Sequence, residues 1–360
     1  MLSRTLRSKV LVALLGLSAA VGCGGGLRLK LVNQSTAKPS NVAVYFAVDT
    51  SGGEPVPGLT AEKFIIYEDG QKVSEFESKQ TILNPTVAAA HYTLLLVDMS
   101  GSIVESKSAP AVVDAASKFT AKVGKYQKVA VAAFDGSTEL TGIVPFTDSG
   151  SAAQGGLDKL TTFKPKDPST NLHGAVVEGL KVLRKALDAE TKPLKFGTLV
   201  VFTDGTDRAN RVPRDDMKKA MADDKYKDFE VYAIGVGAEM KNSKLEEIGK
   251  SGTVLEADPN KTQAAFDQIA TKIEGMTQRY YLLSYCTPSR AGEHEVEIEA
   301  KTDKGSGSIK YKFNADGFGP NCDPNTPPPF DLAHPVDPKD KGGSGGSGSV
   351  KGSVKVETKK

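Results

Sequence analysis

The segment Tyr92–Ser102, with the sequence YTLLLVDMSGS, constrains the fold more than any other part of the chain. The apolar run Leu94–Val97 leads directly into Asp98, and hydroxyl side chains follow at Ser100 and Ser102. A continuous apolar run predicts a strand buried on both faces, as in a parallel sheet covered by helices. Such sheets carry their binding residues in the loops at the strand ends. Because Asp and Ser supply hard oxygen donors, the segment predicts a site for a small divalent cation at the sheet edge.

Two later segments extend this pattern. One is Ser169–Gly174, which contains Thr170 and leads into a predicted helix; the other is Thr198–Gly205, a second buried strand that ends at Asp204. The D-x-S-x-S motif, the downstream Thr and the strand-end Asp together resemble the metal-ion-dependent adhesion site of von Willebrand factor type A domains. The resemblance covers roughly residues 90–280 and keeps the order of the family's motifs.

The resemblance implies a role for each of five residues. Ser100 and Ser102 would coordinate the ion directly, Thr170 would do so in the ligand-bound state, and Asp98 and Asp204 would act directly or through water. Three neutral hydroxyls leave the ion electropositive, so that a partner's carboxylate can fill an open position. Mg²⁺ suits such a site because it keeps waters and accepts few carboxylates, and Mn²⁺ or Ca²⁺ could replace it. The alternative interpretation is that these loops are structural turns with capping hydroxyls.

Strands and helices alternate from residue 89 to residue 280. This alternation predicts an α/β fold with a doubly wound, mostly parallel sheet of Rossmann-like type. The strand near 139–146 is expected at the sheet edge and antiparallel, as the resemblance implies. The predicted helices cover 108–123, 151–161, 172–189, 214–224, 243–250 and 259–278.

The segments on either side of this domain have strand patterns. Residues 27–88 contain alternating apolar positions and the hairpin signal Asp69-Gly70. Residues 281–318 alternate at Val296 and Ile298. The first segment resembles the β-domain that precedes type A domains in exported bacterial proteins. We therefore expect one small all-β, immunoglobulin-like sandwich built from both flanks, with the type A domain inserted in it.

The two ends of the chain have compositions that do not fit a folded core. Basic residues precede the apolar stretch Val10–Val21, which at about 1.5 Å per residue is too short to cross a bilayer. Residues 1–22 are therefore predicted to be a signal peptide. Cys23 resembles the lipidated residue of a bacterial lipobox, with an ordinary signal peptide as the alternative, and 23–26 would be a tether. Residues 319–360, rich in Pro, Gly, Ser and Lys, are predicted to be a disordered tail.

The remaining cysteines form a candidate pair. Outside the inner membrane, Cys286 and Cys322 can oxidise to a disulfide. Two unpaired thiols are the alternative.

Composition excludes one class of function, nucleic-acid binding. The net charge of +2 and the absence of Trp argue against a nucleic-acid partner. We expect a non-enzymatic, lipid-anchored protein of the bacterial cell envelope, at the outer membrane. It would bind an acidic protein ligand through the metal, with His173 and Asp207 as candidates for the ligand face. The alternatives are a metal-dependent hydrolase and an envelope scaffold in which the metal is only structural.

Overall fold

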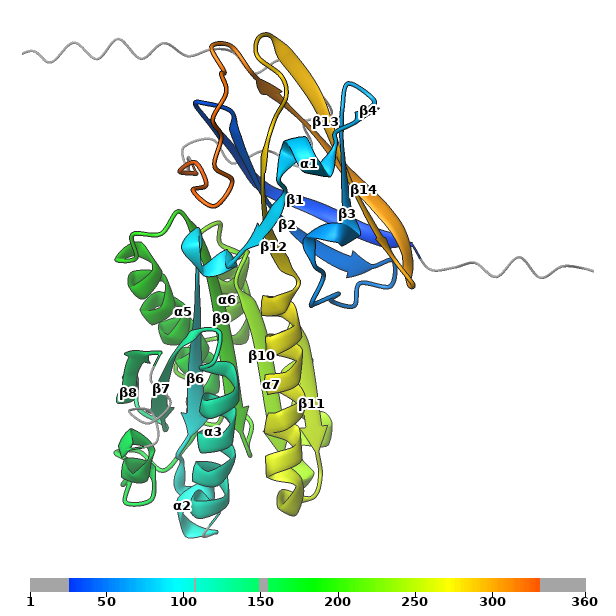
Figure 1. Cartoon of the computed structure of the whole chain (residues 1–360). Helices are drawn as coiled ribbons and strands as arrows, with labels where there is room; N and C mark the ends of the chain where they lie inside the picture. The colour runs from blue at the N-terminus through cyan, green and yellow to red at the C-terminus, as the bar shows by residue number, and fades with distance from the viewer. Residues whose placement is uncertain (1–25, 107, 149–154, 331–360) are drawn as a thin grey trace, which may run out of the picture.

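The computed structural model describes residues 26–106, 108–148 and 155–330. The predicted signal peptide, Cys23, most of the tether and residues 331–360 lie outside the described residues. The described chain forms an α/β domain and a β-sandwich, placed end to end (Figure 1).

A six-stranded sheet forms the centre of the α/β domain, in the order β11-β10-β9-β6-β7-β8. Neighbouring strands are parallel except β8, which pairs antiparallel with β7 at one edge, as predicted. The strands are β6 (Ala89–Asp98), β7 (Lys128–Phe134), β8 (Thr141–Thr147), β9 (Leu194–Thr203), β10 (Glu230–Val236) and β11 (Gly252–Glu256). The mostly parallel sheet with helices on both faces confirms the predicted α/β fold.

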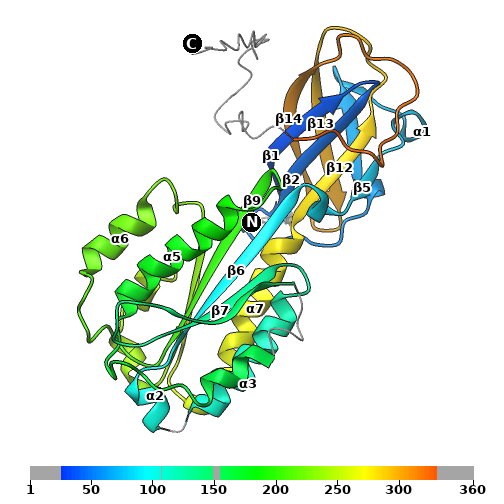
Figure 2. The ribbon, with the colours of Figure 1, turned by 90° about the vertical axis from the view of Figure 1, so that its left-hand side faces the viewer.

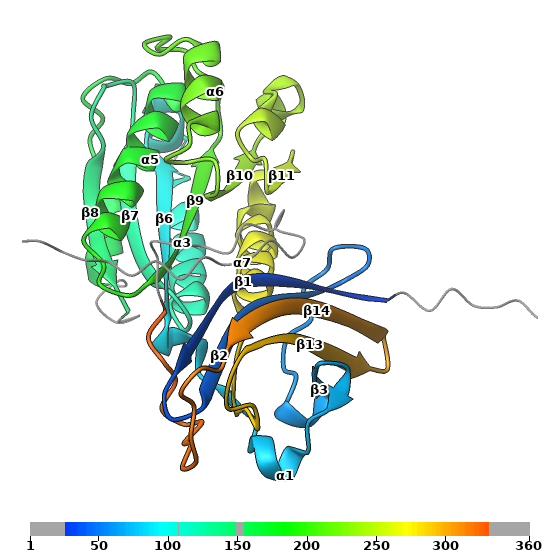
Figure 3. The same cartoon turned by 90° about the horizontal axis from the view of Figure 1, so that it is seen from above.

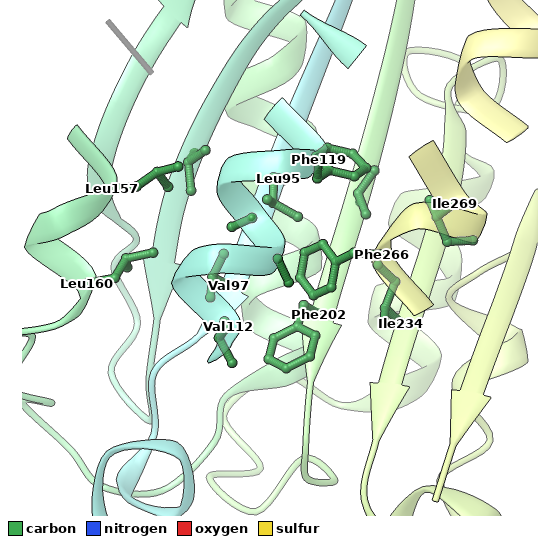
Figure 4. Packing of buried hydrophobic residues seen from close by; sticks show 14 of the residues in the cluster. Leu95, Val97, Val112, Phe119, Leu157, Leu160, Phe202, Ile234, Phe266 and Ile269 are labelled. Carbon is green, nitrogen blue, oxygen red and sulfur yellow. The ribbon is translucent and has the colours of Figure 1, made fainter. Parts of the chain in front are cut away.

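Helices cover both faces of this sheet (Figure 2). On one face α3 (Ala109–Val123) and α7 (Thr262–Gln278) pack on Leu95 and Val97, and Figure 4 shows this layer. On the other face α5 (Leu172–Asp188) and α6 (Arg214–Ala222) pack in the core layer of Leu94 and Leu96. Successive strand residues point to opposite faces. The continuous apolar run of β6 is therefore explained by a hydrophobic layer on each side.

Short helices lie in several of the connections between these elements. They are α2 (Gly101–Glu105), η3 (Asp158–Leu160), η4 (Ala238–Asn242), η5 (Leu245–Glu247) and η6 (Pro259–Lys261). The helix predicted over 243–250 is wrong, because this stretch contains only the 3₁₀ turn η5. Lys244 has a φ of 51°, in the left-handed region, which interrupts a right-handed helix before it can form.

Two four-stranded sheets form the sandwich, in the orders β1-β2-β12-β5 and β14-β13-β3-β4. The elements are β1 (Leu27–Ala37), β2 (Asn41–Thr50), η1 (Ala61–Lys63), β3 (Phe64–Glu68), β4 (Gln71–Lys72), α1 (Glu75–Ser78), β5 (Thr81–Leu83), η2 (Pro85–Val87), β12 (Tyr280–Cys286), β13 (Glu293–Thr302) and β14 (Gly305–Asn314). Strands β1 and β14 of the two sheets lie side by side (Figure 3). Gln34 Nε2 on β1 donates a hydrogen bond to the Lys312 carbonyl on β14 at 2.8 Å. The sandwich thus contains strands from both flanks.

The hairpin predicted at Asp69-Gly70 joins β3 to β4. The φ angles of Asp69 and Gly70 are 50° and 79°. Positive φ at both positions is what a tight two-residue hairpin turn requires.

The sandwich packs against the α/β domain through the outer face of β2. Ala43 and Tyr45 are buried in a cluster with Ala89 and Leu194, which lie at the start of strands β6 and β9. His91 stacks on Phe196 with ring centroids 4.6 Å apart, beside Tyr280. The contact lies at the beginning of the central strands, so the loops at their carboxyl ends remain at the far end of the molecule (Figure 1).

Residues 319–330 correct the predicted start of the tail, because they are placed on the sandwich. Cys322 forms a disulfide with Cys286 at the end of β12. Asn41 Nδ2 donates to the carbonyls of Asp323 and Thr326 at 2.6 and 2.8 Å. Phe330 is buried in the cluster between the two domains. Composition alone missed this segment, since it is held by one disulfide, backbone acceptors and a single aromatic ring.

Candidate metal centre

Asp98 ends strand β6 and is fully buried. Its Oδ1 accepts a hydrogen bond from the Ser100 backbone N at 2.9 Å, and its Oδ2 accepts one from Thr203 Oγ1 at 2.6 Å. Thr203 ends the adjacent parallel strand β9. Parallel pairing of β6 with β9 therefore brings the two predicted strand-end segments together.

The next turn of chain carries the two serines. Ser102 Oγ donates to Asp204 Oδ1 at 2.8 Å and lies 3.2 Å from Ser100 Oγ. Gly101 N donates to the Pro168 carbonyl at 2.9 Å, and a Cβ at Gly101 would lie 3.0 Å from Pro168 Cβ. The absence of a side chain at position 101 thus allows this turn to approach the loop that carries Thr170.

Two acidic residues, Asp135 and Asp167, accept hydrogen bonds that fix the backbone of the loop containing Thr170. Asp135 is buried at the end of β7, and its two oxygens accept from the backbone N of Ser137 and of Lys166, each at 2.7 Å. Asp167 Oδ1 accepts from Ser169 N at 2.9 Å and from Ser169 Oγ at 2.7 Å. These bonds restrict the loop before any ion is present.

Arg211 connects this loop to the one that follows Asp204. Its Nη2 donates to Asp167 Oδ2 at 2.6 Å, and its Nε donates to the Gly136 carbonyl. Hydrogen bonds from Ser169 and then from Arg211 lower the pKa of Asp167 to about 2. The Thr170 carbonyl accepts from the backbone N of Arg208 at 2.9 Å, which ties the two loops together a second time.

A cavity of about 300 Å³ opens beside these residues. Ser102 of helix α2 lines it together with Thr170 and Asp204, which lie in two separate loops. Ile103, Val112, Phe202 and Val236 form its apolar wall. Asp98 and Ser100 are buried next to this opening rather than in its lining. The structure therefore gathers all five predicted ligand residues at the carboxyl end of the central sheet.

Neither carboxylate in this group has a basic side chain at ion-pair distance within the described residues, although the charge of Arg208 acts on Asp204. Burial raises the pKa of Asp98 to about 6, although hydrogen bonds from Thr203 and Ser100 act in the opposite direction. Burial also raises the pKa of Asp204. Within the described residues neither carboxylate forms an ion pair, and no three His, Cys, Asp or Glu side chains form a metal-binding group. A bound divalent cation would compensate these two charges, with hydroxyl oxygens as further ligands, so the donor set fits Mg²⁺ or a similar hard ion.

His173 and Asp207 are not part of this cavity. Asp207 Oδ2 accepts from the His173 backbone N at 2.8 Å and lies 3.5 Å from His173 Nδ1. Both residues line a separate cavity of about 260 Å³ with Arg214 and Glu247. Their position supports a role at the beginning of helix α5 rather than on the candidate ligand face.

Sequence reasoning missed Thr203 and the Asp167–Arg211 pair. Thr203 is the last residue of the second Asp-bearing strand, next to Asp204. The alternation of side chains along a strand could have shown only that Thr203 and its neighbour Phe202 point to opposite faces. Nothing in the sequence pairs Asp167 with Arg211, because the contact depends on how two loops fold over each other.

The arrangement defines a class: a doubly wound α/β domain with an oxygen-lined site at the carboxyl ends of its strands. Residues 93–253 match the family model of the von Willebrand factor type A domain. This part of the chain is therefore a von Willebrand factor type A domain.

Solved structures with a similar fold include three with TM-scores near 0.4. A von Willebrand factor type A protein from Catenulispora acidiphila is 15% identical, with a TM-score of 0.41, over 86% of this chain and 78% of that one. Proximal thread matrix protein 1 of the mussel byssus, with a zinc-occupied adhesion-site motif, is 17% identical, with a TM-score of 0.42, over 51% and 47%. The pilus adhesin SpaC from Lactobacillus rhamnosus GG is 13% identical, with a TM-score of 0.41, over 81% and 42%. Comparison with curated proteins gave no match.

Within the described part of the chain, no helix combines the length and apolar character required to span a bilayer.

Proposed function

We propose that this protein is a non-enzymatic binding protein of the bacterial cell envelope that holds an acidic protein ligand through a divalent cation. Ser100, Ser102 and Thr170 would offer hydroxyl oxygens, and Asp98 and Asp204 would offer carboxylate oxygens directly or through water. A bound Mg²⁺ supplies an electropositive centre with a position open to an outside carboxylate. Anchoring through a lipid on Cys23, at the outer membrane, would place this domain on the envelope.

The single observation that carries the proposal is the placement of two carboxylates beside three hydroxyl side chains: Asp98 is fully buried, Asp204 is partly buried at the cavity, and neither forms an ion pair within the described residues. Asp98 is held at 2.6 Å by Thr203, and Asp204 at 2.8 Å by Ser102. Negative charge on the buried Asp98 and on the partly buried Asp204 beside it is unfavourable unless a cation balances it. The sandwich contacts the opposite end of the sheet, which leaves this end free for a partner (Figure 1).

A direct experiment measures binding of a fluorescent tetra-aspartate peptide to the purified protein. Binding should occur in Mg²⁺, disappear in EDTA, and be absent for a tetra-asparagine peptide. The variant Asp204→Ala should lose it as well. Binding that is equal in Mg²⁺ and in EDTA would contradict the proposal.

A further inference from the structure

The rim of the 300 Å³ cavity carries one exposed ion pair. Arg208 Nη2 lies 2.5 and 2.7 Å from the two carboxylate oxygens of Glu239. Arg208 belongs to the loop after Asp204, and Glu239 belongs to η4, which follows strand β10. Both residues line the cavity together with Ser102, Thr170 and Asp204. The pair therefore lies on the approach to the candidate metal centre.

Arg208 is the only cationic side chain among the described residues that line this cavity. Its backbone is fixed, because its N donates to the Thr170 carbonyl at 2.9 Å. Arg211, the nearest basic residue along the loop, is already engaged by Asp167 and the Gly136 carbonyl. An acidic ligand that reaches the cation from this side thus meets one guanidinium, which is paired with Glu239.

Glu239 forms the kind of contact that such a ligand would form. Nη2 of Arg208 contacts both carboxylate oxygens of Glu239, and a guanidinium forms such charge-assisted hydrogen bonds with a carboxylate whichever molecule supplies it. The side chains of Arg208 and Glu239 are 61% and 52% exposed. Ion pairs this exposed contribute only about 0–1 kcal/mol, so exchange of one carboxylate for another meets little resistance.

We infer that Glu239 is a built-in competitor for the ligand: it occupies Arg208 in the free protein, and an acidic peptide with a second carboxylate displaces it. This inference rests on the proposed function, because the first carboxylate of the peptide is held by the cation. It specifies the ligand further, as a segment with neighbouring acidic residues rather than a single one. Glu239 then lowers the apparent affinity for any ligand that also binds Arg208.

The test uses the labelled tetra-aspartate peptide in Mg²⁺, with Glu239→Gln, Arg208→Gln and the double variant. Glu239→Gln should bind up to about fivefold more tightly than the natural protein, and Arg208→Gln more weakly by a similar factor. The double variant should bind like Arg208→Gln, since the gain requires a free guanidinium. Glu246→Gln removes one exposed charge from the neighbouring turn and should change little.

A second readout does not depend on affinity. Phenylglyoxal labelling of Arg208, mapped by mass spectrometry, should be slowed by the peptide in the presence of Mg²⁺ and be faster in Glu239→Gln.

The outcomes separate this inference from the proposed function. Unchanged peptide affinity in Glu239→Gln, or a gain that persists in the double variant, overturns the competitor role while metal-dependent binding still stands. A persisting gain would mean that Glu239 only repels the peptide at a distance. Peptide binding that is unaffected by EDTA, or an absence of peptide binding in the natural protein and in every variant, overturns both the competitor role and the proposed function.

Discussion

Thr203 Oγ1 lies 2.6 Å from Asp98 Oδ2, although the two residues are 105 positions apart in the chain. The same hydroxyl lies 2.9 Å from the Gly205 carbonyl and 3.1 Å from its N. Thr203 thus orients Asp98, a proposed metal ligand at the end of β6, and fixes the loop that follows its own strand β9. Groups that orient metal ligands in this way affect metal affinity without touching the ion.

Replacement of Thr203 by Val should weaken Mn²⁺ binding by about tenfold, because Asp98 loses the hydrogen bond that fixes its carboxylate. Isothermal titration calorimetry measures the affinity. Thr198→Val, the same substitution in the middle of strand β9, is the matched control and should bind as the natural protein does. Equal affinities for the two variants would refute the orienting role of Thr203.

The loop around Gly136 leaves no space for a side chain at this position. A Cβ at this position would lie 2.5 Å from Asp167 Oδ1 and closer still to Ser169 Oγ. Gly136→Ala should therefore displace the Thr170 loop and weaken both metal and peptide binding. Gly142→Ala is the control, since a Cβ there meets nothing within 4 Å. The prediction fails if Gly136→Ala retains natural Mn²⁺ affinity.

His91 should make stability depend on pH. Burial, and then the charge of Lys192, lower the pKa of His91 to about 4, so the ring between Phe196 and Tyr280 is neutral in the folded protein. The unfolded chain takes up a proton below pH 6.5, and the folded chain does so only near pH 4. Stability is thus lost as pH falls through this window, by about 3 kcal/mol for this group.

The variant His91→Phe isolates that contribution. Urea unfolding of both proteins from pH 7 to pH 4 gives the difference in their free energies of unfolding. The difference should shift in favour of the variant as pH falls, because Phe keeps the stacking but cannot take up a proton. A difference that is constant across this range would argue against a neutral, buried His91.

The disulfide should stabilise the sandwich and leave the metal centre unaffected. Cys286 and Cys322 are 36 residues apart, and a loop of this size contributes about 2–4 kcal/mol in the chain-entropy account. The double variant Cys286→Ser, Cys322→Ser should unfold at lower urea concentration and bind Mn²⁺ normally. A loss of Mn²⁺ affinity without unfolding would show that the two ends of the molecule are coupled.

Much of the fold was predictable from local patterns. The apolar runs of β6 and β9 indicated a sheet buried on both faces, and Asp69-Gly70 indicated a hairpin. The closeness of Asp98 and Asp204 could be expected because each lies where a buried parallel strand ends, whereas Thr170 and the two serines were included because their motifs resemble those of type A domains. Their role as metal ligands stays a prediction.

Contacts between loops could not be predicted in the same way. Asp167 and Arg211 meet across two irregular segments, and no periodicity relates their positions. Lys244 interrupts a predicted helix through one left-handed backbone angle, which propensity does not reveal. Phe330 is buried by tertiary contact in a segment whose Pro-rich composition is typical of a tail.

Calorimetric titration of the purified protein with Mn²⁺ tests the central claim most directly. The natural protein should bind one ion, and Asp98→Asn and Ser102→Ala should each bind at least about tenfold more weakly, with circular dichroism spectra unchanged. Asp228→Asn, which removes an exposed charge elsewhere in the same domain, should bind normally. Natural Mn²⁺ affinity in both Asp98→Asn and Ser102→Ala would contradict the account.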